Sequence, residues 1–516
     1  MQGGKGISAA LHNKFDGGTI EVKKIMTSVL CVLLCLLFLL IPTACSGGNG
    51  STTTLPERTP EEEAAYDEAI KKLIDLDSFT NKDEVVFYME TCGLGINFVR
   101  EVASDYKRLT GINVRAIENS NVAQALANEM AVNSFVGDIY ATLDLRHTWI
   151  QYATAGKLVD LTDMVSEDDW RDPIYNDLGT WEGKRYMINY TYNPTGFVYN
   201  QQYLDQIESR GEYTKGEFPT TWQGLIDLCE AVEASDLMRN GAKVKGFSWG
   251  ATTYDMDYIF KALWAQSDYE GFREYYEYDQ TDAYPEELLH TEGVEKALNA
   301  ILQLINPQQN MRGDYYPGYA VSGAIGQSNI QAQTSFINGA CVFTVSGGWF
   351  TSEMSGAIGD KDYFKFANVP MLEGNTEAAV NINAPGEVMF IPTHANNVEG
   401  AKQFLRFVLL EPNLQRMHEA TQTPFAFKYD EENLSLSDWG RNVLEVASSG
   451  EPAIAGSGSK VAVSGAMRLF MTSDPFVRMA QGQVKNVVTD IINLEAERHQ
   501  GQQWIDCMKT IGVVVG

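Results

Sequence analysis

The feature that most constrains the fold is a regular alternation of strand-like and helix-like stretches. Stretches rich in β-branched and aromatic residues cover Glu84–Met89 and Ile112–Ile117, and a third opens at Gly137–Tyr140. Between them, Phe98–Leu109 and Val122–Val132 place apolar residues at helical spacing. Such an alternation produces a mostly parallel sheet with helices on both faces. We therefore expect an α/β fold.

Length and charge limit the organisation and the partners. The chain is longer than one hydrophobic core usually serves, so two domains are expected. The formal net charge is −29, which argues against nucleic acid because nucleic-acid binding requires neutralising Lys and Arg side chains. It also argues against an anionic ligand, and it fits a solvated acidic surface.

The N-terminal region has the pattern of a secretory signal peptide. An unbroken apolar run of 13 residues, Val29–Ile41, follows Lys23 and Lys24. A membrane-spanning helix, the alternative, needs about 20 residues. We expect residues 1–44 to be the signal peptide. Acidic residues before position 22 do not fit its basic start, so the natural start is expected near Val22 or Met26.

The end of this region resembles the lipobox of bacterial lipoproteins. Thr43, Ala44 and Cys45 match it, whereas Pro42 departs from the usual Leu. Cys45 is therefore the predicted lipidation site, which would anchor the chain to the membrane by two acyl chains. The small and polar residues that follow predict a flexible tether over residues 45–80.

Catalytic and metal-binding patterns do not occur in the sequence. There is no HExxH, GxSxG or Walker A motif and no CxxC pair, and the six His residues lack metal-ligand spacing. Ser457–Lys460 reads SxxK, but the SDN and KTG companions of penicillin-binding serine enzymes are missing. We expect no catalysis, no cofactor and no metal. Free thiols and disulfides both remain open for Cys92, Cys229, Cys341 and Cys507.

Six segments, in order along the chain, together resemble one family of binding proteins. They are YKRLTGINV (Tyr106–Val114), GDIYATLD (Gly137–Asp144), AGKLVDLTDMV (Ala155–Val165), GKRYMINYTYNPTGFVYN (Gly183–Asn200), FPTTWQGLIDLCEAV (Phe218–Val232) and FINGACVFTVSGGWF (Phe336–Phe350). From about residue 84 to residue 510, the chain is similar to the extracellular solute-binding proteins of carbohydrate ABC importers, the group that includes the maltodextrin-binding proteins.

The resemblance implies a periplasmic-binding-protein-like fold. Two α/β lobes with mostly parallel sheets would be joined by a multi-strand hinge and would close on a ligand between them. Lobe 1 is expected over 81–192 plus 371–425, and lobe 2 over 193–370 plus 426–516. The chain would cross near Asn189–Gly196, return near Val369–Leu372 and cross again after Thr423.

The resemblance also implies a function. The protein would be a monomeric extracellular lipoprotein that binds a sugar, in particular an oligosaccharide, and delivers it to the transmembrane subunits of an ABC permease. Two alternatives stay open. One is a lipid-anchored carbohydrate-active hydrolase, and the other is a surface adhesin or scaffold that keeps the binding-protein fold.

The chemistry of sugars suggests which residues bind. Aromatic rings cover the apolar faces of a sugar, and carboxylates and amides bond its hydroxyls. Trp349 matches a family tryptophan that stacks on sugar, although core packing is an equal alternative for it. Tyr190 and Tyr192 flank the first crossing and point the same way from an extended strand. The other candidates lie at strand ends and in loops: Glu90, Asp144, Trp249, Tyr254, Asp257, Asn383 and Glu387.

Overall fold

The structure is a computed structural model. It describes residues 55, 57–142, 148–176, 178–251, 255–276, 289–306, 318–372, 380–383, 387–454, 474–484, 486–487, 489–491 and 493. The predicted signal peptide, Cys45, Cys507 and the SxxK pattern lie outside these residues. Within the described part of the chain, no helix combines the length and the apolar character needed to cross a membrane.

Five strands form the first sheet, in the order β2-β1-β3-β14-β6. They are β2 (Val114–Asn119), β1 (Val85–Glu90), β3 (Ile139–Thr142), β14 (Val388–Phe390) and β6 (Ile188–Asn189). β1 pairs in parallel with β2 and β3, whereas β14 runs antiparallel to both of its neighbours. The predicted α/β alternation from Glu84 onward is confirmed, and the sheet is mixed, with two parallel and two antiparallel pairings.

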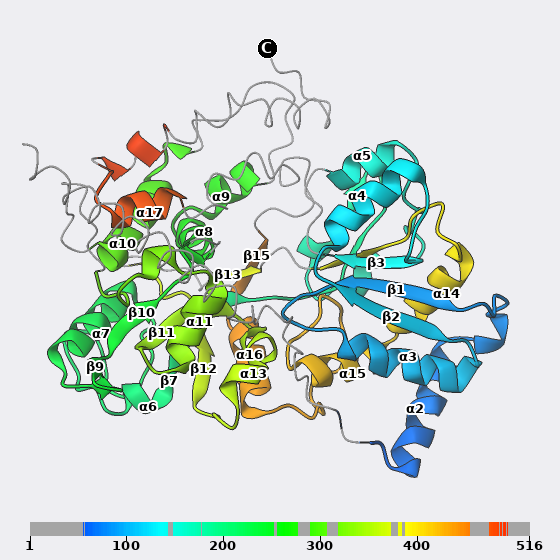
Figure 1. Ribbon diagram of the computed structural model, residues 1–516, viewed down its shortest axis with the longest axis horizontal. Helices are drawn as coiled ribbons and strands as arrows, with labels where there is room; N and C mark the ends of the chain where they lie inside the picture. The colour runs from blue at the N-terminus through cyan, green and yellow to red at the C-terminus, as the bar shows by residue number, and fades with distance from the viewer. Residues whose placement is uncertain are drawn as a thin grey trace, which may run out of the picture. The chain divides into compact units, whose positions relative to one another are not determined.

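Helices cover both faces of this sheet (Figure 1). Val85, Phe87 and Met89 of β1 point into one core, where they join side chains of α3 (Asn97–Thr110). Tyr88, on the opposite face, packs in a second core with side chains of α4 (Val122–Val132) and α5 (Thr148–Thr154). Because successive side chains of a strand point to opposite faces of the sheet, alternate residues of β1 pack against different layers of helices.

Four strands form the second sheet, in the order β10-β11-β7-β12. They are β10 (Lys245–Ser248), β11 (Cys341–Gly347), β7 (Thr195–Asn200) and β12 (Phe364–Ala367). β10 and β11 are parallel, and β7 is antiparallel to β11 and β12. The surrounding helices include α7 (Trp222–Ala234), α8 (Asp255–Ser267), α10 (Glu292–Ile305) and α11 (Asn329–Ile337).

In each sheet one strand runs against the others, and it is the strand by which the chain crosses over from the other sheet. β7 follows β6 of the first sheet directly, so the first crossing lies between Asn189 and Thr195. The chain returns through β14, after β13 (Val380–Asn383). This return lies further along the chain than the one expected near Val369–Leu372. The Met371 carbonyl instead accepts the Trp222 amide at 2.7 Å, which holds that segment at the start of α7.

The remaining helices and strands are short or lie at the edges of the two sheets. α15 (Glu411–Thr421) packs on α3 of the first sheet, and α16 (Asp438–Ser448) packs on β12 of the second, so the chain passes between the sheets once more after α15. The others are α6 (Gln201–Leu204), α9 (Tyr269–Tyr276), α12 (Phe350–Glu353), α13 (Ser355–Ile358), α14 (Val398–Val408), α17 (Asp474–Ala480), β4 (Thr180–Trp181), β5 (Lys184–Arg185), β8 (Met238–Arg239), β9 (Ala242–Lys243) and β15 (Glu451–Ile454).

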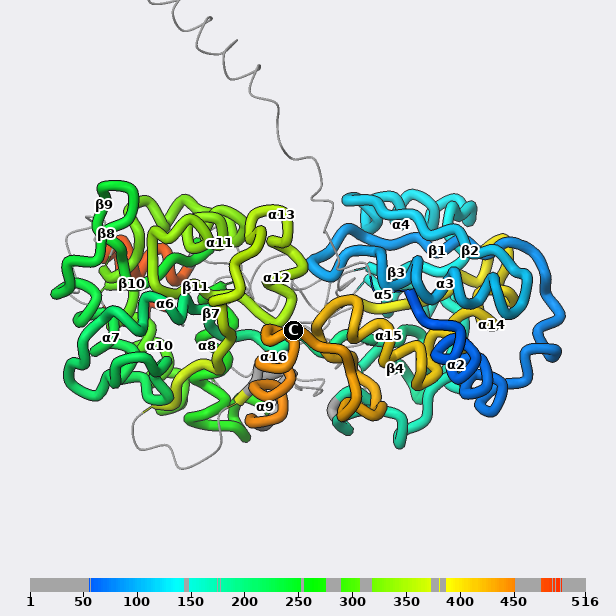
Figure 2. Tube along the Cα trace, turned by 90° about the horizontal axis from the view of Figure 1, so that it is seen from below, coloured from blue at the N-terminus to red at the C-terminus, as the bar shows by residue number. Residues whose placement is uncertain are grey.

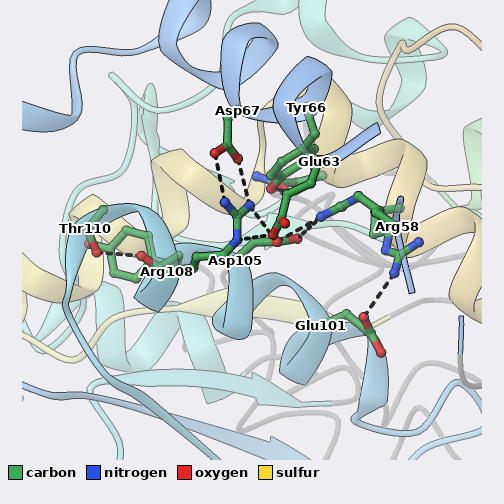
Figure 3. Close-up of polar contacts among 11 residues, drawn as sticks. Arg58, Glu63, Tyr66, Asp67, Glu101, Asp105, Arg108 and Thr110 are labelled. Carbon is green, nitrogen blue, oxygen red and sulfur yellow. Dashed lines mark hydrogen bonds and ion pairs between the residues drawn. The ribbon is translucent and has the colours of Figure 1, made fainter. Parts of the chain in front are cut away.

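The chain before β1 forms a docked helix, α2 (Pro60–Leu73), which lies beside α3 and α15 (Figure 2). A capping box between Thr59 and Glu62 begins this helix. Arg108 of α3 binds Asp67 at 2.7 Å (Figure 3), and the Tyr66 hydroxyl donates to Asn413 of α15 at 2.5 Å. The flexible tether expected over residues 45–80 is therefore corrected, because residues 60–73 are helical and packed.

Candidate functional site

The first part of the site lies at the carboxyl ends of β1 and β3. Open α/β sheets bind ligands at this edge. The Thr142 hydroxyl, at the end of β3, donates to the carboxylate of Glu90, at the end of β1. After Glu90 the chain turns through Cys92 and Gly93 before α3 begins. The predicted binding residue Glu90 is thus placed at the edge of the sheet where ligands are expected.

The first crossing between the sheets supplies the second part. Tyr190 is fully buried and stacks on Phe425, with ring centroids 6.2 Å apart and an angle of 18° between the planes. Tyr192 is also buried, and its hydroxyl donates to the Ala447 carbonyl at 3.3 Å. The next residue, Asn193, donates from Nδ2 to Glu387 Oε2 over 3.5 Å.

Trp349 connects the two parts. Its side chain is 8% exposed. A Cβ on Gly93 would lie 2.9 Å from Trp349 Cδ1, and a Cβ on Gly347 would lie 2.1 Å from Cζ3 of the same ring. Two glycines, one in the loop after β1 and one at the end of β11, therefore leave the space that the indole fills. The Trp349 ring lies against the loop after β1 of the first sheet, although Trp349 itself follows β11 of the second sheet.

Two carboxylates lie next to this tryptophan. Glu353, one helical turn after Trp349, accepts a hydrogen bond from the Trp349 side chain and another from Gln333 Nε2 at 2.9 Å. Burial raises the pKa of Glu353, and the negative charge of Glu387 raises it further. Burial likewise raises the pKa of the Cys92 thiol, with an added contribution from Glu387, to which the thiol is hydrogen-bonded. Glu353 and Glu387 are therefore close enough to interact electrostatically.

These contacts join residues from both sheets into one group, which we call the central cluster: Cys92, Tyr190, Asn193, Gln333, Trp349, Glu353 and Glu387. Three of its buried polar atoms have no hydrogen-bond partner among the described residues, namely Tyr190 Oη, Asn193 Oδ1 and Gln333 Oε1. Buried polar groups in native proteins are nearly always hydrogen-bonded. The central cluster therefore has capacity for additional polar groups.

Comparison with known proteins identifies the family. A family model described as bacterial extracellular solute-binding protein matches residues 101–429. The chain belongs to this family. A search of the curated proteins finds no match. Among solved structures, one from work on xylan utilisation by the thermophilic bacterium Caldanaerobius polysaccharolyticus is similar, with a TM-score of 0.62 and 15% identity, covering 80% of this chain and 99% of the other.

The family and the structural neighbour confirm two predictions from the sequence. The resemblance to extracellular solute-binding proteins is correct, and so is the periplasmic-binding-protein-like α/β fold. The family match covers the first crossing and the Trp349 segment, and it contains every member of the central cluster except Cys92, which lies before its first residue.

The structure brings together some of the predicted binding residues of this solute-binding protein. Trp349, Tyr190 and Glu387 belong to the central cluster, and Glu90 lies two residues before Cys92 in the chain. Trp249 is buried in the core, and Asp257 forms an ion pair with Lys261 in α8 at 2.5 Å. Their binding roles, like that of Tyr192, stay predictions. Asp144, Tyr254 and the Asn383 side chain lie outside the described residues.

Four members of the central cluster were not predicted as binding residues from the sequence, and one of them, Cys92, was considered only as a thiol or a disulfide partner. Asn193 lies in the segment of the first crossing that carried the family resemblance, directly after Tyr192. Glu353 follows Trp349 by four residues, which is one turn of a helix. That spacing is the signal that points to Glu353. Gln333 gives no comparable signal, because only tertiary packing of α11 places it beside Glu353.

The described cysteines and acidic residues show no metal or disulfide chemistry. Cys92, Cys229 and Cys341 are free thiols, and burial raises the pKa of each. Among the residues that the structure describes, no group of three or more His, Cys, Asp or Glu side chains is arranged to hold a metal ion. The central cluster is made of aromatic, amide, carboxyl and thiol groups.

Proposed function

We propose that this solute-binding protein captures a sugar, specifically an oligosaccharide, between its two sheets and delivers it to an ABC permease. The observation that carries the proposal is a set of buried polar atoms near the Trp349 ring that have no partner in the described part of the chain: Tyr190 Oη, Asn193 Oδ1 and Gln333 Oε1. An aromatic face next to unsatisfied polar groups fits a ligand with an apolar face and a polar rim. The subject of the similar structure, xylan utilisation, agrees with a carbohydrate.

In this proposal the two sheets are the centres of two lobes that move relative to each other. Trp349 and Glu353 belong to the second lobe, and Cys92 and Glu387 to the first, so a ligand among them contacts both. A ligand that contacts both lobes stabilises the closed form over the open form, and this difference in affinity is what a permease can detect. The protein acts as a monomer, binds without making or breaking bonds, and is held to the membrane by a lipid on Cys45.

Calorimetric titration with oligosaccharides of different backbone and length tests the proposal. We expect one class to bind and to raise the melting temperature without being consumed. At a concentration one hundred times the Kd, the stabilisation should be about 2.7 kcal/mol. Trp349→Ala should raise the Kd at least tenfold. Trp181→Ala, in β4, is the matched control and should leave the Kd unchanged.

Three results would contradict the proposal. Release of reducing sugar during the titration would favour the hydrolase alternative. Failure of every saccharide to bind would remove the sugar as ligand. An unchanged Kd in Trp349→Ala would place this ring in the core alone. The anchor is tested separately, because Cys45→Ala should move the protein from the membrane fraction to the medium while its Kd stays the same.

A further inference from the structure

We infer that the sugar bound by the central cluster carries a protonated amine. The inference rests on the proposed function and specifies its ligand. It follows from the kind of hydrogen-bonding groups that the cluster offers and from the absence of a cation among the described residues around its two carboxylates.

The central cluster is rich in hydrogen-bond acceptors. It contains two carboxyl groups, those of Glu353 and Glu387, and an ionised carboxylate accepts hydrogen bonds without donating any. Asn193 and Gln333 use their amide nitrogens to donate to these two carboxylates, so each amide turns its oxygen, which also only accepts, away from them. Both amide oxygens are among the buried atoms that have no partner in the described part of the chain. A ligand that satisfies them has to donate.

No cation among the described residues balances the charge of the two carboxylates. Among the described residues, neither Glu353 nor Glu387 forms an ion pair with Lys, Arg or His. The groups that reach them are neutral: the Trp349 side chain and the Gln333 amide for Glu353, and the Asn193 amide and the Cys92 thiol for Glu387. A buried carboxylate without a cation is unfavourable, and Glu387 is only 4% exposed.

An ammonium group meets both requirements. It donates three hydrogen bonds, accepts none and carries the missing positive charge. A sugar hydroxyl donates one hydrogen bond, brings no charge and also needs a donor for itself. An acidic sugar would place a third negative charge beside Glu353 and Glu387. The net charge of −29 adds a field that attracts a cationic ligand and repels an anionic one.

The experiment compares oligosaccharides that differ in the group on one ring carbon. Glucosamine oligomers, their N-acetylated forms, cello-oligosaccharides of equal length and oligogalacturonates are titrated by calorimetry at pH 7, with spermidine as an amine without a sugar. We expect the glucosamine oligomers to bind at least tenfold more tightly than the N-acetylated forms, and the oligogalacturonates not to bind.

Charge-neutral variants connect this preference to the cluster. Glu353→Gln and Glu387→Gln should each reduce the preference for the amine to less than threefold while binding of the neutral sugars stays within threefold of wild type. Glu399→Gln, an exposed residue of α14, is the matched control and should keep the full preference. Two independent variants keep the test valid where one of them fails to fold.

The outcomes separate the inference from the proposed function. Equal binding of the amine and its neutral counterparts overturns the inference and leaves the sugar-binding function standing. An amine preference that survives in both Gln variants overturns the role of Glu353 and Glu387. Binding of spermidine with no binding of any saccharide overturns both the inference and the proposed function.

Discussion

Acid should destabilise the protein through one buried histidine, His418 of α15. The side chain is fully buried, its Nδ1 lies 3.0 Å from the Tyr429 hydroxyl, and its Nε2 has no hydrogen-bond partner among the described residues. Burial lowers the pKa of His418 from its ordinary 6.5 to about 3, and the positive charge of Arg171 contributes to this shift. Glu431 lies 3.7 Å from Nδ1, but it is already paired with Arg171.

The sign and size of the effect follow from this pKa. The unfolded chain takes up a proton on this side chain below pH 6.5, and the folded protein does not do so until the pH approaches 3. The free energy of unfolding is therefore unaffected above pH 6.5 and falls as the pH drops below it. One pKa unit corresponds to about 1.4 kcal/mol. Between pH 7 and pH 5, His418 alone should remove about 2 kcal/mol.

Urea denaturation at the two pH values measures this contribution. The difference in unfolding free energy between pH 7 and pH 5 should be about 2 kcal/mol smaller in His418→Gln than in wild type. Comparing the differences cancels both the titration of all other groups and any uniform loss of stability in the variant. His394→Gln, at an exposed position, should keep the wild-type difference. Identical pH dependence in His418→Gln and wild type would refute the reasoning.

Three further substitutions test the packing described above. Gly196→Ala should lower the unfolding free energy, measured by urea denaturation, by about 2 kcal/mol or more. The reason is that its Cβ would lie 2.2 Å from the Ala367 carbonyl oxygen. A Cβ on Gly326 would have no atom within 4 Å, so Gly326→Ala should change the unfolding free energy by less than about 0.5 kcal/mol. Tyr66→Phe should cost about 1–3 kcal/mol in local stability, seen as faster amide exchange in α2, since the Asn413 oxygen loses its donor. Gly93→Ala should raise the Kd for the ligand severalfold, because its Cβ would displace the Trp349 indole. Gly326→Ala is the control and should keep the wild-type Kd.

The sheets could be predicted from the sequence because their strands are local patterns. Val85–Glu90 and Val114–Asn119 are strands near the positions expected from β-branched and aromatic residues, and Gly111 ends α3 with a φ of 75°. The helix α2 was missed for a different reason. Its sequence is rich in Glu and Lys, and on its own it reads as a solvated segment. Only the ion pairs of Arg108 and the burial of Tyr66 against α3 and α15 show it to be part of the fold.

The site could be predicted only in part, because its residues come from segments far apart in the chain. Trp349 and Glu387 were accessible through family motifs, which record position in the sequence. The roles of Gln333 and Asn193 could not be predicted, although Asn193 lies in a family segment, because each orients its amide toward a carboxylate that another segment supplies.

The direction of the strands explains why these distant segments meet. The chain enters the second sheet by β7 and returns to the first sheet by β14, and each of these strands runs against its neighbours. An entering strand starts at the edge where the parallel strands end, because it runs the opposite way. The residues just before β7 and β14, Asn193 and Glu387, are therefore delivered to the carboxyl ends of β1, β3 and β11. In the proposed function, a ligand held there would contact the connections between the two sheets, so the topology itself would couple binding to closure.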